Sequence, residues 1–68
     1  MKTVSGKHFC KVLERHGWVL QRVAGSHHVY RRPNDPLIVT VPVHGNRDLK
    51  RGLLSQLLRI TGILENEL

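Results

Sequence analysis

The stretch Gly25-Ser26-His27-His28-Val29-Tyr30-Arg31 decides how the rest of this chain folds. Glycine accepts the positive φ of a tight turn at no steric cost, so the first two residues predict a hairpin turn. The β-prone run that follows predicts a strand that starts at the two histidines. Side chains alternate across a strand, which puts His27 and His28 on opposite faces. Of these two, only His28 shares its face with Tyr30.

Two further strands are predicted on either side of this stretch. Residues Trp18–Val23 precede the turn and form the first expected strand, and His27–Arg32 is the second. The segment Pro33–Pro36 predicts a turn, because proline restricts φ and both asparagine and aspartate tolerate turn geometry. Leu37–Val41 is mostly β-branched and is predicted as the third strand. Pro42 is expected to end it.

One helix is predicted before the sheet and one after it. Ser5 can cap a first helix that begins at residue 6 or 7, and Gly17 is a natural stop for it. Either Asn46 or Asp48 is expected to cap the second helix, which Gly62 ends. Both segments carry an apolar stripe at helical spacing. The stripes consist of Phe9, Val12, Leu13 and His16 in the first helix and Leu49, Leu53, Leu54, Leu57 and Leu58 in the second.

These elements predict an α+β fold with the order α-β-β-β-α, formed by residues 1–68 as a single small domain. The three strands form an antiparallel sheet, and both helices pack on one face of it. Trp18 is expected to fold back onto the end of the first helix as a core anchor. The apolar side chain of Val29 assigns it to the packed face. His28 and Tyr30 are therefore expected on the open face.

Charge is the strongest compositional signal in this chain. Eleven Lys and Arg residues stand against five acids, which gives a formal net charge of +6. From Arg15 to Asn34 there is no acid, whereas four arginines and three histidines lie in that range. Neutralisation of phosphates supplies much of the affinity of proteins for nucleic acids. This distribution favours a nucleic-acid partner over a surface that is merely basic and soluble.

Other features bear on the compartment and on single residues. The apolar runs are far shorter than the ~20 residues of a membrane helix, and the N-terminal residues lack the apolar core of a secretory signal. Cys10 is alone, so we expect a cytoplasmic protein and read this thiol as a packing residue rather than a reactive one. Gly52 lies inside a predicted helix, where close approach to the sheet or to a ligand would explain it, as would simple tolerance.

The chain contains, in this order, the segments Gly17-Trp18, Gly25–Tyr30, Val39–Pro42 and Asp48–Leu54. Together these four segments resemble the HicA toxins of prokaryotic toxin–antitoxin pairs. The resemblance implies a fold like the double-stranded-RNA-binding domain and cleavage of mRNA without a metal ion or other cofactor. It also implies a catalytic histidine at the Gly-Ser-x-His position, here His28, and inhibition by a HicB antitoxin that covers the site. The family pattern does not require the proline-rich turn or the tail Leu64–Leu68.

Histidine suits RNA cleavage because its ordinary pKa of about 6.5 allows proton transfer near neutral pH. A base on the 2′-hydroxyl turns the RNA into its own nucleophile, so His28 needs neither a protein nucleophile nor a metal. Arginine or lysine near it would stabilise the charge that develops on the phosphate. Tyr30 is expected to stack on an unpaired base. Further RNA contacts are expected at Arg22, Gly25, Ser26 and Lys50.

Several alternatives remain open at this point. His28 could be a strand histidine that only forms hydrogen bonds, and His44 could be a second acid–base group or an exposed loop residue. A zinc site formed by His27, His28 and His44 is disfavoured, because adjacent strand histidines diverge and no paired-ligand spacing exists. The two leading hypotheses are a ribonuclease toxin and a non-catalytic RNA-binding module. We expect a monomer whose antitoxin covers the strand His28–Arg32, with Arg22 and Lys50 at the rim.

Overall fold

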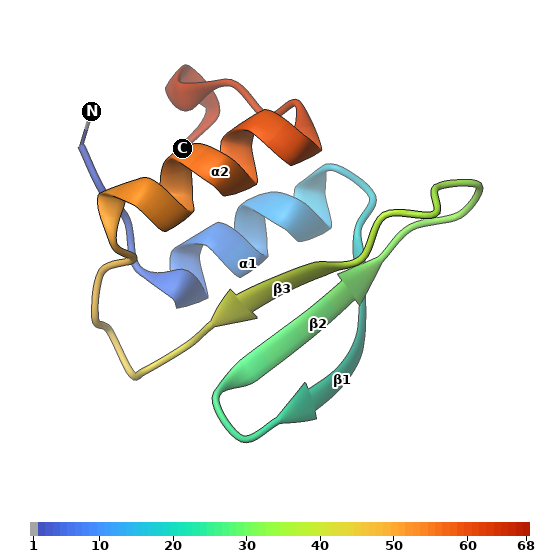
Figure 1. The fold of residues 1–68 in the computed structure, drawn as a ribbon, viewed down its shortest axis with the longest axis horizontal. Coiled ribbons are helices and arrows are strands. Elements are labelled where there is room, and N and C mark those ends of the chain that lie inside the picture. Colours follow the sequence, from blue (N-terminus) through green and yellow to red (C-terminus); the bar gives the residue numbers. More distant parts are fainter. Residues whose placement is uncertain (1) are drawn as a thin grey trace.

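The computed structural model describes residues 2–68, which form two helices, three strands and a short 3₁₀ helix. The α-β-β-β-α order predicted from the sequence is confirmed, and the fold is α+β (Figure 1). The elements are α1 (Gly6–Arg15), β1 (Val19–Ala24), β2 (His27–Arg31), β3 (Val39–Pro42), α2 (Arg51–Thr61) and η1 (Glu65–Glu67).

The three strands form one antiparallel sheet in the order β1-β2-β3, so β2 lies in the centre. The predicted hairpin turn between β1 and β2 is confirmed, and Gly25 adopts a φ of 61° there. β3 begins at Val39 instead of at the predicted Leu37. The reason is local, since the Leu37 N–H donates to the side chain of Asp35 and thereby joins the proline-rich turn.

A single cluster of buried side chains joins both helices to one face of the sheet. Along β3, Val39 and Val41 are buried and Thr40 between them is exposed, as expected for a strand with one covered face. Trp18 is buried as predicted, and its backbone N–H donates to the carbonyl of Leu13. The buried cluster consists of Phe9, Cys10, Val12, Leu13, Trp18, Tyr30, Val39, Val41, Leu49, Leu54, Leu57 and Ile63.

The residues predicted for the two ends of α1 are confirmed. The His8 N–H donates to the Ser5 Oγ at 3.0 Å, which satisfies one of the free amides of the first turn. At the other end, Gly17 follows the helix with a φ of 87°. η1 packs back on this helix, where His16 Nε2 lies 2.8 Å from Glu67 Oε2.

The predicted cap of α2 is wrong. The helix begins at Arg51, and its cap residue Lys50 makes no side-chain hydrogen bond to it. Leu49 donates its N–H to the carbonyl of Val4, and Asp48 bridges the backbone of Ser5, so the chain stays extended up to that point. The side chain of Asp48 is also occupied, because it accepts a hydrogen bond from Thr3. Tertiary pairing therefore overrides the local capping signal.

The predicted faces of the central strand are reversed. Tyr30 is only 1% exposed and lies on the helix side, where its hydroxyl donates to Glu14 Oε2 at 2.9 Å. Val29 lies on the opposite, open face, paired with Arg22 on β1 and Thr40 on β3. A tyrosine ring buries more apolar area than a valine side chain does, and here its hydroxyl finds a partner on α1. Burial of Tyr30 therefore stabilises the fold more than burial of Val29 would.

Candidate active site

His28 lies on the same face of β2 as Tyr30 and is half-buried, with its side chain in a surface hollow beside α1. Cross-strand pairing places it between Val23 of β1 and Val41 of β3. The hollow has a volume of about 240 Å³. Its walls come from α1 and from the sheet. The lining residues are Lys7, Cys10, Lys11, Glu14, Leu20, His28, Tyr30 and Val43.

Two cations of α1 line this hollow together with the histidine. Lys7, Lys11 and Glu14 recur at helical spacing, so their side chains share one face of the helix. The carboxylate of Glu14 already accepts the hydrogen bond of Tyr30. Among residues 2–68, neither lysine forms an ion pair with an acid. The hollow therefore combines an imidazole with two lysine ammonium groups that are free to meet an anion.

Two other polar groups of the hollow are kept neutral. Burial raises the pKa of the Tyr30 hydroxyl far above its usual value, and the hydrogen bonds with Cys10 and Glu14 act in the same direction. Burial is also the main cause that raises the pKa of the Cys10 thiol. A thiol without thiolate character is a poor nucleophile. Cys10 thus packs in the core, and His28 is the side chain of the hollow best suited to proton transfer near neutral pH.

The other predicted site residues do not gather around His28. Gly25 and Ser26 form the β1–β2 turn, and the Ser26 carbonyl accepts the N–H of Val43 at 2.7 Å. Arg22 projects from the open face of β1, and Lys50 precedes α2, so neither of them lines the hollow. Cross-strand pairing therefore places Arg22 on the face of the sheet opposite His28 and Tyr30. The stacking role expected for Tyr30 is withdrawn, because a base cannot reach a buried ring.

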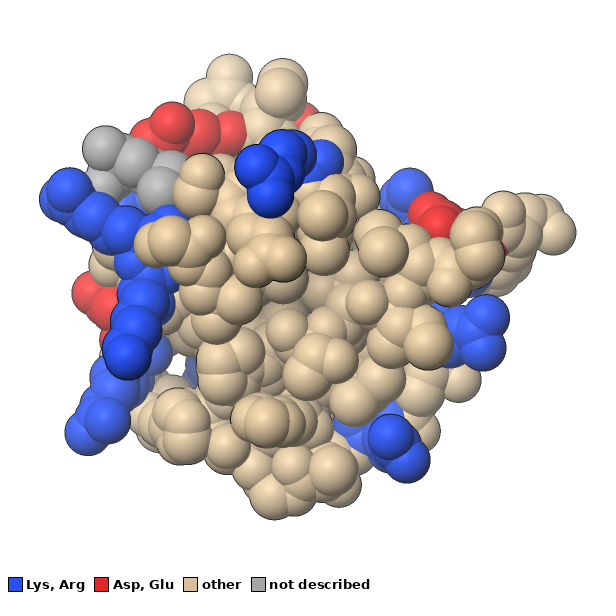
Figure 2. Space-filling model, viewed as in Figure 1, with Lys and Arg blue, Asp and Glu red and all other residues tan. Residues whose placement is uncertain are grey.

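Sequence reasoning missed the contribution of α1 to this site. Lys7 and Lys11 stood out in the sequence only as the polar side of an amphipathic helix. Had Tyr30 been assigned to the buried face, the alternation of β2 would have turned His28 toward that helix. Figure 2 shows that Lys and Arg side chains also gather along the edge of the molecule where both helices begin. Other Lys and Arg side chains lie at the opposite edge and at the top of the same view.

The described part of the chain contains neither a cluster of metal-binding side chains nor a membrane-spanning helix. No three His, Cys, Asp or Glu side chains of residues 2–68 are grouped so that they could hold a metal ion. No helix in that range has the length and apolar character needed to cross a membrane. His44, considered as a second acid–base group, is exposed in the loop after β3 and does not line the hollow.

Comparison with known protein families matches residues 6–63 to the family described as the HicA toxin of bacterial toxin–antitoxin systems. Comparison with curated proteins yields no match. The matched segment begins with α1, ends just after α2 and contains His28 together with Lys7 and Lys11. It covers well over half of the chain, so the resemblance of the sequence motifs is confirmed and the chain belongs to the HicA toxin family.

Proposed function

We propose that this chain is an endoribonuclease toxin that cleaves mRNA with His28 and is neutralised by a HicB-type antitoxin. The observation that carries the proposal is the position of His28 in a hollow beside Lys7 and Lys11. An imidazole next to unpaired cations supports phosphodiester cleavage, because the imidazole can transfer a proton and the cations stabilise the charge on the phosphate. The lone buried cysteine and the family membership support a site of action in the cytoplasm.

In the proposed reaction, neutral His28 accepts the proton of a ribose 2′-hydroxyl. The 2′-oxygen then attacks the adjacent phosphorus, and the bond from phosphorus to the 5′-oxygen breaks. Protonation of that leaving oxygen, by the imidazolium or by water, completes the step and leaves a cyclic phosphate and a 5′-hydroxyl. Lys7 and Lys11 stabilise the negative charge that grows on the phosphate oxygens during the attack. The RNA supplies the nucleophile, so no serine or cysteine is needed.

Replacement of Lys7 or Lys11 by alanine is expected to lower kcat/KM for RNA cleavage by about 10- to 100-fold, because each removes a cation that meets the reacting phosphate. The matched control is Arg59→Ala, an exposed cation on α2 that lies outside the hollow. The Lys→Arg variants should recover most of the rate, since they restore the charge. Equal rates for the alanine variants and the control would contradict the role of α1.

Cleavage is expected to proceed unchanged when EDTA removes divalent ions, because the proposed step uses a histidine and lysines rather than a carboxylate-held metal. The measurement compares initial rates on one single-stranded RNA before and after chelation, with magnesium added back. A rate that falls with EDTA and returns with magnesium would show that the reaction needs a metal ion. The salt concentration has to be kept constant, because RNA binding to a basic protein depends on it.

The turn residues Gly25 and Ser26, together with Arg22 and Lys50, remain candidates for RNA contact. The first two immediately precede the β2 strand that carries His28. The alternative function is a non-catalytic RNA-binding module, which the same basic charge would serve. The His28→Ala variant separates the two, because a binding module would hold RNA equally well with or without the imidazole and would cleave it in neither form.

A further inference from the structure

The structure separates two surfaces that belong to the same strand. On β2, His28 faces the helices, and Arg31, three residues later, faces the other side of the sheet. We define the open face as the side chains of Val19, Arg22, Val29, Arg31 and Thr40, which cross-strand pairing and alternation place on the side without helices. A partner on this face would not touch the hollow of His28.

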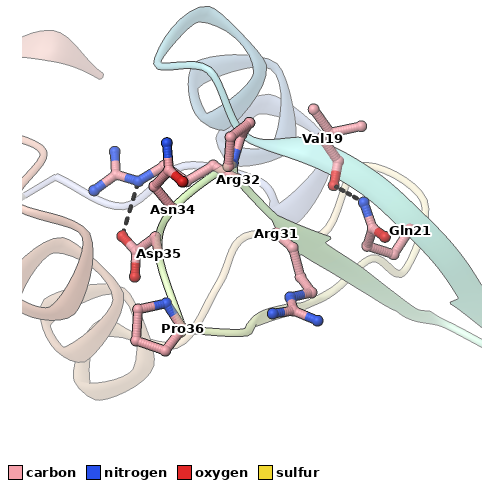
Figure 3. A pocket seen from close by; sticks show the side chains of 8 residues that line it. Val19, Gln21, Arg31, Arg32, Asn34, Asp35 and Pro36 are labelled. Carbon is pink, nitrogen blue, oxygen red and sulfur yellow. Dashed lines mark hydrogen bonds and ion pairs between the residues drawn. The ribbon is translucent and has the colours of Figure 1, made fainter.

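One end of the open face is hollowed, and this hollow has a volume of about 560 Å³ (Figure 3). It lies between β1 and the proline-rich turn. Val19, Pro33 and Pro36 supply apolar walls, and Gln21 is held in place by a hydrogen bond from its amide to the Val19 carbonyl at 3.3 Å. Arg31 projects between these two sides of the hollow.

Arg31 and Arg32 both line this hollow, but only one of them is free to pair with an acid of a partner. Arg32 is occupied, because its Nε lies 2.9 Å from Asp35 Oδ2 and its guanidinium stacks 4.5 Å from the centroid of the Trp18 ring. Arg31 is exposed and makes no ion pair with any acid of residues 2–68. The hollow thus offers one free guanidinium, whose planar donors match a carboxylate in a bidentate pair.

The rest of this surface favours a protein over RNA as its occupant. Val19, which pairs with Arg31 across β1 and β2, is 53% exposed, so a large aliphatic side chain lies beside Arg31. Arginine is enriched among the central contacts that carry most of the binding energy of protein interfaces. Proteins that hold single-stranded RNA commonly stack its bases on exposed aromatic rings, whereas Trp18 and Tyr30 are buried.

We propose that this end of the open face is a docking site for an acidic protein surface that presents a carboxylate to Arg31 between aliphatic side chains. A second copy of this chain fits poorly, because Arg22 and Arg31 would face like charges and the chain carries a net charge of +6. The antitoxin implied by the family is the partner with which to test the site. The docking site is independent of the chemistry at His28.

The test measures binding of the full-length chain to its antitoxin across a salt series, with RNA cleavage measured in parallel. Arg31→Glu should weaken antitoxin binding by about 100-fold or more, because it places two carboxylates against each other in a desolvated contact. Arg59→Glu is the matched charge reversal on α2 and should change binding by about twofold at most at high salt. Arg31→Glu should leave RNA cleavage within about threefold of the wild type, since Arg31 faces away from His28.

Each alternative occupant gives its own result in this experiment. Wild-type antitoxin binding by Arg31→Glu would overturn the docking site. Loss of RNA binding and cleavage with intact antitoxin binding would mean that the open face holds RNA. A wild-type dimer that Arg31→Glu dissociates would mean that a second copy of the chain is the occupant. An inactive wild-type chain would contradict the proposed ribonuclease function but leave the binding result interpretable.

Discussion

Replacement of His28 by alanine is expected to reduce the rate of RNA cleavage by about 10²- to 10⁴-fold, the usual contribution of a positioned acid–base group. Lys7 and Lys11 would remain, so the variant should still bind RNA. The side chain is half-buried at the rim of a hollow and is not part of the core cluster, so the variant should fold. Cleavage of a defined RNA and growth arrest on expression are the two measurements.

His27→Ala is the matched control, because it removes the same group from the adjacent position. Its side chain is exposed on the opposite face of β2, so cleavage should stay within about threefold of the wild type. Circular dichroism and thermal unfolding of both variants establish that the fold is kept. A folded His28→Ala protein that still cleaves RNA and arrests growth would refute the assignment of this histidine, whatever the control does.

Replacement of Gly6 by alanine is expected to destabilise the protein by about 2–3 kcal/mol, toward the upper end of what overpacking usually costs. A Cβ at this position would overlap the carbonyl oxygen of Pro42 and also crowd Leu49. The obstacle at Pro42 is backbone, so α1 would have to move away from the end of β3. For a chain of this size, thermal unfolding should shift down by roughly 10–20 °C.

Gly52 provides the internal comparison, because it is also a glycine in the first turn of a helix. A Cβ there would meet no atom within 4 Å, so close approach to the sheet does not explain this glycine. Gly52→Ala should therefore stabilise the isolated chain by about 0.5–1 kcal/mol, the cost of glycine in a helix. If Gly6→Ala and Gly52→Ala had the same stability, the close contact between α1 and β3 would not exist.

The contact at Gly6 matters for the site as well as for stability. It seats the first turn of α1 against the end of β3, and the next residue along that helix is Lys7. Lys11 follows one turn later, on the same side as the hollow of His28. A shift of α1 in Gly6→Ala is therefore expected to lower cleavage even at temperatures where the variant is folded, because catalysis depends on close positioning.

The sequence alone determined the order of the elements and most of their ends. Ser5 accepts a hydrogen bond from a residue three positions along the chain. Gly17, Gly25 and Gly62 adopt a positive φ, which glycine tolerates. These ends could be predicted because they depend only on residues close in sequence. The family followed from motifs in the correct order and was confirmed over residues 6–63. His28 was identified as the candidate catalytic residue from the same motifs, and its role remains to be tested.

Tertiary structure alone decided which face of the sheet each side chain occupies. Alternation along β2 establishes that His28 and Val29 point in opposite directions, but it does not say which of them faces the helices. That choice depends on the area that Tyr30 buries and on the partner that Glu14 offers its hydroxyl, two residues brought together only by folding. Long-range pairing of Leu49 with Val4 likewise moved the first residue of α2 to a position after Leu49. Long-range packing also placed Lys7 and Lys11 beside His28.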